Sequence, residues 1–125
     1  MAELKRLAAA LVWMVAVVSL AGPAGAQPVE REWVIETIHE AADTYGISRW
    51  SMVELARCES TFEPEAVGYR GWYVGLFQWE IGSWLETPFA DYSRTNAWAN
   101  SHATGRALAR GEAWRWPHCR WEAGL

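Results

Sequence analysis

Glu59 is the side chain whose position in this 125-residue chain most clearly indicates chemistry. It follows Leu55 by four residues and Met52 by seven, so in a helix these three would share one face. Pro64 prevents that helix from extending far beyond Ser60, which places Glu59 in its last turn. The helix dipole and the apolar neighbours both disfavour a negative charge there. A carboxyl kept protonated is suited to general acid catalysis; a solvated glutamate at a frayed helix end is the other interpretation.

Short motifs in a fixed order surround this residue. Residues 59–67 read Glu-Ser-Thr-Phe-Glu-Pro-Glu-Ala-Val, and residues 75–78 read Gly-Leu-Phe-Gln. Together they resemble the signature of the lytic transglycosylase and goose-type lysozyme families, in which a helix ends in Glu-Ser. Asn96, which follows Thr95, resembles the asparagine that opens a later helix in these families, and the whole resemblance covers residues 47–121.

The resemblance implies a role for each matching residue. Glu59 would protonate the glycosidic oxygen between N-acetylmuramic acid and N-acetylglucosamine, and would then act as the base. The substrate's own hydroxyl would be the nucleophile, so one carboxyl group would suffice, unlike in glycosidases that use a carboxyl pair. The partner would be the glycan strands of peptidoglycan, without a cofactor or a metal. The substrate-binding residues would be Ser60, Gln78, Trp79 and Asn96.

Other interpretations stay open at this point. Ser60 could serve only as a helix-end residue, and Gln78 could brace the backbone. A hydrolytic lysozyme could use Glu80 or Asp91 to hold a water molecule. A non-catalytic cell-wall-binding module and a structural or inhibitory secreted protein are the alternatives from other classes.

Ten tryptophans are unusual in so short a chain, and they admit two interpretations. Flat aromatic faces suit the apolar faces of sugars, but most tryptophans in a small domain must pack in its core. We expect one or two of Trp72, Trp79 and Trp84 to contact sugar, because these three flank the Gly-Leu-Phe-Gln segment. Trp33 and Trp50 fall on predicted helices and are expected to pack in the core.

The elements that must position these residues are mostly helical. Val34, Ile38, Ala41 and Tyr45 form an apolar stripe at helical spacing, which Gly46 ends. We therefore expect helices at 28–45, at 49–60 with Ser48 as N-cap, and at 96–110 with Thr95 as cap and Gly111 as stop, besides a helical turn at 81–86. Residues 63–74 indicate a loop with a short hairpin. The expected fold is mainly α, a small lysozyme-like domain with one disulfide.

The first 26 residues are typical of a secretory signal peptide. Lys5 and Arg6 precede an apolar run from 7 to 20, and Ala24-Gly25-Ala26 offers a cleavage site. We therefore divide the chain into a signal peptide, 1–26, and one domain, 27–125, that is secreted or bound to the cell wall. An uncleaved membrane anchor is the alternative.

An exported chain with two cysteines most simply forms one disulfide, here between Cys58 and Cys119. Free thiols or a metal site are weaker interpretations, because the histidines show no zinc-ligand spacing with the cysteines. The closing Trp-Arg-Trp-Pro-His-Cys of residues 114–119 also resembles small secreted actinobacterial members of the family.

Charge and hydropathy argue against two kinds of binding partner, nucleic acid and the membrane interior. The net charge of −4 argues against sequence-independent binding to nucleic-acid phosphates. No apolar run after residue 26 is long enough to span a membrane. We expect a monomer.

Overall fold

The computed structural model describes residues 28–125, so the predicted signal peptide at 1–26 lies outside the described residues. The longer helices are α1 (Pro28–Tyr45), α2 (Arg49–Ser60) and α4 (Ala97–Ala109), and α3 (Ile81–Leu85) is a short one. Two single 3-10 turns are η1 (Tyr69–Gly71) and η2 (Ala113–Arg115). The prediction of a mainly helical chain with one disulfide is confirmed.

The expected hairpin is part of a small three-stranded antiparallel sheet in the order β1-β2-β3. Its strands are β1 (Val67–Gly68), β2 (Tyr73–Val74) and β3 (Trp79–Glu80). Val74 lies opposite both Val67 on β1 and Trp79 on β3. The structure therefore adds a strand that the sequence pattern did not indicate, because two-residue strands are too short to show alternation.

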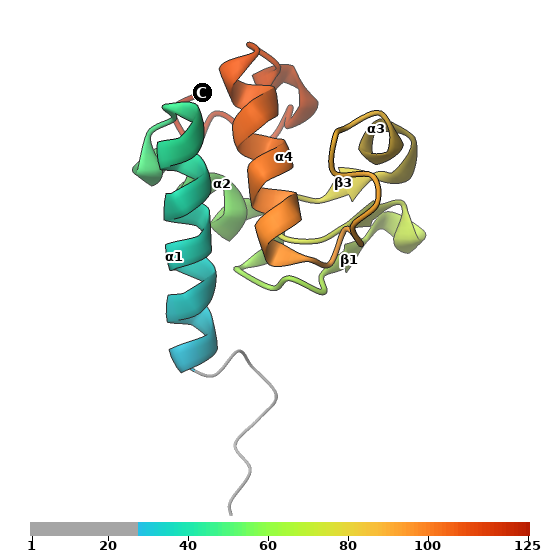
Figure 1. Cartoon of the computed structure of the whole chain (residues 1–125), viewed down its shortest axis with the longest axis horizontal. Coiled ribbons are helices and arrows are strands. Elements are labelled where there is room, and N and C mark those ends of the chain that lie inside the picture. The colour runs from blue at the N-terminus through green and yellow to red at the C-terminus, as the bar shows by residue number, and fades with distance from the viewer. Residues whose placement is uncertain (1–27) are drawn as a thin grey trace, which may run out of the picture.

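Helices α1 and α4 run alongside each other, and the sheet and α3 lie on the other side of α4 (Figure 1). Gly105 on α4 permits this close approach. A Cβ atom at this position would lie 2.7 Å from the Tyr45 ring and 3.2 Å from the carbonyl oxygen of Ala41. Ile38 of α1 and Leu55 of α2 are fully buried in the single core.

The helix ends follow local capping chemistry, with one correction. The Ser48 hydroxyl accepts a hydrogen bond from the Ser51 amide at 3.2 Å, as expected for an N-cap. Helix α4 is capped by Asn96, whose Oδ1 accepts from the Ala99 amide at 2.9 Å, and not by Thr95 as predicted. The Thr95 hydroxyl instead lies 2.8 Å from that of Ser93.

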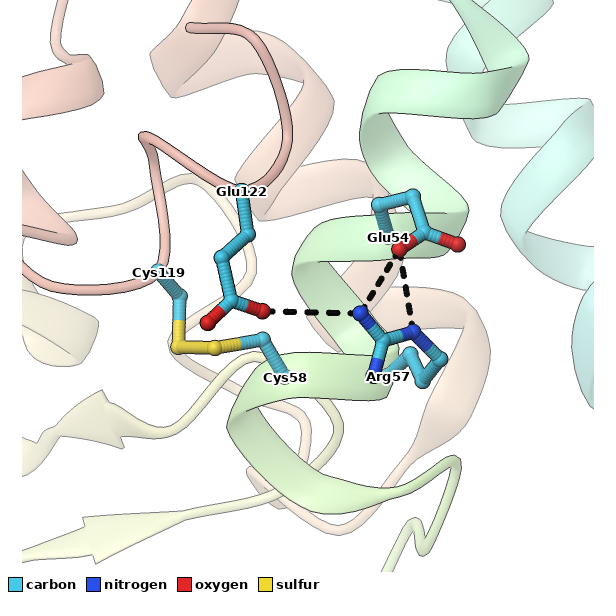
Figure 2. Close-up of polar contacts among 5 residues, drawn as sticks. All are labelled: Glu54, Arg57, Cys58, Cys119 and Glu122. Atoms are coloured by element: carbon cyan, nitrogen blue, oxygen red, sulfur yellow. Dashed lines mark hydrogen bonds and ion pairs between the residues drawn. A yellow bond between two sulfur atoms is a disulfide. The ribbon is translucent and has the colours of Figure 1, made fainter.

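The C-terminal tail is attached to α2 by a disulfide between Cys58 and Cys119, whose Cα atoms lie 5.7 Å apart. Beside this bond, the Arg57 guanidinium pairs with Glu54 at 2.8 Å and with Glu122 of the tail at 3.4 Å (Figure 2). The disulfide predicted from the two cysteines is thus present, and it connects the helix that carries Glu59 to the end of the chain.

The expectation that Trp33 and Trp50 pack in the core is wrong. Their exposed fractions are 55% and 59%. In α1 the stripe through Val34 and Ile38 faces the core, and Trp33 lies beside this stripe rather than on it.

Within residues 28–125, no helix combines the length and the apolar character needed to cross a membrane.

Candidate active site

Glu59 lies in the last turn of α2, as the sequence predicts, and its side chain is partly buried. Burial raises the pKa of the Glu59 carboxyl from its usual 4.5 to about 7, and no neighbouring charge or hydrogen bond offsets this effect. The carboxyl is therefore protonated in about half of the molecules at neutral pH. Such a group is able to donate a proton and to take one back.

The backbone on both sides of Glu59 is fixed. Cys58, the preceding residue, is held by the disulfide to the tail. Thr61 and Phe62 after the helix have left-handed backbones, with φ of 53° and 63°, and the Thr61 amide donates to the Arg57 carbonyl at 3.0 Å. The helix end is thus a defined turn rather than a frayed terminus.

Ser60 serves the helix itself. Its hydroxyl donates to the Ala56 carbonyl at 3.1 Å, one helical turn back. The structure therefore gives Ser60 the helix-end role that the sequence left as an alternative. A substrate contact by Ser60 stays a prediction.

Gln78 braces the backbone between two strands. Its side-chain Nε2 donates to the carbonyl of Ala66 at 3.1 Å and to that of Gly75 at 3.0 Å. These bonds hold Gln78 in a left-handed conformation with φ of 53°, which is uncommon for a residue with a side chain. Ala66 follows Glu59 by seven residues, so Gln78 attaches the β2–β3 turn to the segment that leads away from Glu59.

Two buried side chains that sequence reasoning missed also hold this turn. Asn100 on α4 accepts from the Phe77 amide at 2.9 Å and donates to the Arg94 carbonyl at 2.8 Å. The indole Nε1 of Trp116 donates to the Phe77 carbonyl at 2.8 Å. The sequence does offer a signal for Asn100, because it is an asparagine among small and apolar residues of the helix, one turn after Asn96. Asn96 itself is exposed, and its Oδ1 forms the helix cap.

Gly75 begins this turn because no other residue fits. Its φ is +94°, and a Cβ atom there would collide with the carbonyl oxygen of Arg94 and the side-chain amide of Asn100. The Gly-Leu-Phe-Gln segment is thus required by packing, whatever else it does.

Gln78 and Trp79 meet at a cavity of about 200 Å³. It is also lined by Tyr73, Glu80, Ser83, Trp114, Arg115 and Trp116. Glu59, Ser60 and Asn96 do not line this cavity, so the structure does not gather all the predicted site residues in one pocket.

The three tryptophans expected at the substrate differ in exposure. Trp84 is 1% exposed and its Nε1 donates to the Tyr92 carbonyl at 2.9 Å, so the expectation of a sugar contact there is wrong. Trp79 borders the cavity but is 4% exposed, and its Nε1 donates to the Thr104 hydroxyl. Trp72 is exposed but lies outside the cavity lining.

Glu80, the second carboxyl considered for catalysis, caps α3. Its two oxygens accept from the amides of Gly82 at 2.7 Å and Ser83 at 2.9 Å. These hydrogen bonds lower the pKa of Glu80, so it is ionised at neutral pH. Asp91 is exposed on a loop.

Residues 28–125 contain no cluster of three or more potential metal ligands among histidine, cysteine, aspartate and glutamate.

In comparisons with known proteins, no family model, no curated protein and no solved structure matches the chain. What the site does is therefore inferred from its own geometry and from the motif resemblance.

Proposed function

We propose that the chain is a secreted enzyme that cleaves peptidoglycan glycan strands as a lytic transglycosylase, with Glu59 as general acid and base. The observation that carries this proposal is the partly buried position of Glu59 in the last turn of α2, where burial raises the pKa of its carboxyl to about 7. A glutamate in this state at the end of a helix is unfavourable for stability and suited to proton transfer. The motif resemblance supplies the substrate class.

The proposed reaction needs one carboxyl group. Glu59 gives its proton to the glycosidic oxygen while the bond from that oxygen to C1 of N-acetylmuramic acid breaks. The Glu59 carboxylate then takes the proton from the C6 hydroxyl of the same sugar as its oxygen bonds to C1, which yields an anhydro end. Glu80 is committed to capping α3, which favours this one-carboxyl scheme over hydrolysis with a second carboxylate.

The test is the mass of the muropeptides released by the exported protein. Transglycosylation leaves the total mass of the products unchanged, whereas hydrolysis adds one water to each cleaved bond. Anhydro products would support the proposal. Water-containing products would show a hydrolytic lysozyme, and folded protein that binds the wall without cleaving it would show a binding module.

The first prediction concerns Glu59→Gln, which keeps the shape of the side chain and removes the proton. Activity on peptidoglycan should fall by about 100-fold or more, because the proton donor is lost. Glu36→Gln is the control, since Glu36 is exposed on α1, and it should keep its activity. Full activity in a folded Glu59→Gln protein would refute the proposal. An equal loss of activity in either Glu80→Gln or Asp91→Asn would indicate hydrolysis.

A further inference from the structure

The cavity of about 200 Å³ between β3, the start of α3 and the tail has a mixed lining. Two aromatic rings on it are open to solvent, because Tyr73 is 43% exposed and Trp114 is 61% exposed. Trp79 and Trp116 are each 4% exposed and form its buried wall. The cavity thus presents aromatic faces at its opening over a rigid base.

Arg115 holds this arrangement in place. Its Nε and Nη2 donate to Glu112 Oε1 at 3.0 and 2.9 Å. The same guanidinium lies 4.8 Å from the centre of the Trp114 ring and 5.4 Å from that of Trp79. The exposed indole of Trp114 is therefore oriented before any ligand arrives.

The polar groups of the lining complement the aromatic ones. Glu80 brings an ionised carboxylate, which also accepts from the α3 amides and from the Ser83 hydroxyl at 3.1 Å. Aromatic faces combined with a few placed donors and acceptors suit a sugar, which has apolar C–H faces and polar edges.

We propose that this cavity binds one N-acetylhexosamine ring of a glycan strand, stacked on Trp114 and Tyr73, at a subsite whose lining excludes Glu59. The choice of sugar rests on the proposed function. The subsite differs from the sequence expectation, because it uses the exposed Trp114 of the tail in place of the buried Trp84.

The experiment is a titration of the exported Glu59→Gln protein with tri-N-acetylchitotriose, followed by the indole N–H signals in NMR. The Trp114 signal should shift and saturate. Trp114→Ala should weaken binding by roughly tenfold, the loss of about one stacked aromatic contact. No saturable shift, or shifts that leave Trp114 unchanged, would overturn the proposal.

Trp121→Ala is the matched control. Trp121 is 68% exposed and also has an arginine over its ring, with Arg120 at 4.2 Å, but it does not line the cavity. Its substitution should leave the affinity unchanged. Equal weakening by the Trp114 and Trp121 substitutions would overturn the subsite.

The outcome is separable from that of the enzymatic proposal. If the parent protein does not cleave peptidoglycan but the sugar binds in a Trp114-dependent way, the subsite stands and the transglycosylase is refuted. If the parent protein releases anhydro products but Trp114→Ala leaves sugar binding unchanged, the transglycosylase stands and the subsite is refuted.

Discussion

Glu59 illustrates how one residue acquires its chemistry from its surroundings. Its carboxyl is held by the end of α2, beside a disulfide and before a left-handed turn, and it is partly buried. Because nothing compensates its charge, ionisation at this position costs free energy. Stability is thereby lower than an uncharged residue would allow.

This cost can be measured as a pH dependence of stability. The pKa of Glu59 is raised from 4.5 to about 7 in the folded state, so the folded chain holds this proton more tightly than the unfolded chain does. The stability that the bound proton gives is fully present below pH 4.5 and is lost as the pH rises through 7. Glu59→Gln should therefore be more stable than the parent chain at pH 8. We expect a gain on the order of 1 kcal/mol, reduced by solvent screening.

Urea unfolding at pH 8 and pH 4 would test this expectation. The gain should be absent at pH 4, where the parent carboxyl is protonated in both states. A gain that is the same at both pH values would show that packing, and not ionisation, separates the two proteins.

At the scale of elements, the turn at 75–78 depends on partners far along the chain. Asn100 of α4 accepts from the Phe77 amide, and Trp116 of the tail donates to the Phe77 carbonyl. Gln78 donates to the carbonyl of Ala66, the residue before β1. Strands of two residues each are too short for this sheet to be stable alone. Its position is therefore set by α4 and the tail.

Asn100→Ala should destabilise the protein by about 2 to 3 kcal/mol, because the buried Phe77 amide and Arg94 carbonyl lose their partner. Asn96→Ala is the comparison, and loss of this exposed N-cap should cost about 1 kcal/mol. Thermal unfolding of the two variants measures the difference. A larger loss for Asn96→Ala would contradict the bracing role of Asn100.

At the scale of the whole molecule, the disulfide connects α2 to the C-terminal tail. It joins α2, which carries Glu59, to the tail that brings Trp114 and Trp116 to the cavity. The loop that it closes spans 61 positions. Such a crosslink acts chiefly by reducing the freedom of the unfolded chain.

Replacing Cys58 and Cys119 together by alanine should lower the free energy of unfolding by up to about 4 kcal/mol. Arg57→Ala removes the exposed ion pairs beside the same bond, and it should cost less than about 1 kcal/mol. Denaturant unfolding compares the two. Alkylation and intact mass, with and without reductant, check that the parent protein has no free thiol. Equal costs would refute the role assigned to the crosslink.

The sequence by itself determined the features that depend on neighbours along the chain. The stop of α1 before Gly46, the cap of α2 at Ser48 and the end of that helix at Ser60 all follow from local capping and backbone preferences. The apolar face that carries Glu59 follows from helical spacing. The pairing of Cys58 with Cys119 needed no geometry, because the chain has two cysteines.

The tertiary structure decided which tryptophans are covered and which polar groups hold the site. Trp84 is buried and Trp33 is exposed, although both lie on helices. The Trp84 ring packs against Trp79 and its Nε1 donates to the Tyr92 carbonyl, whereas Trp33 lies beside the core-facing stripe of α1. The bonds of Asn100 and Trp116 to Phe77 span 23 and 39 residues. Local patterns carry no record of such contacts, since burial and long-range hydrogen bonding are set only when the whole chain packs.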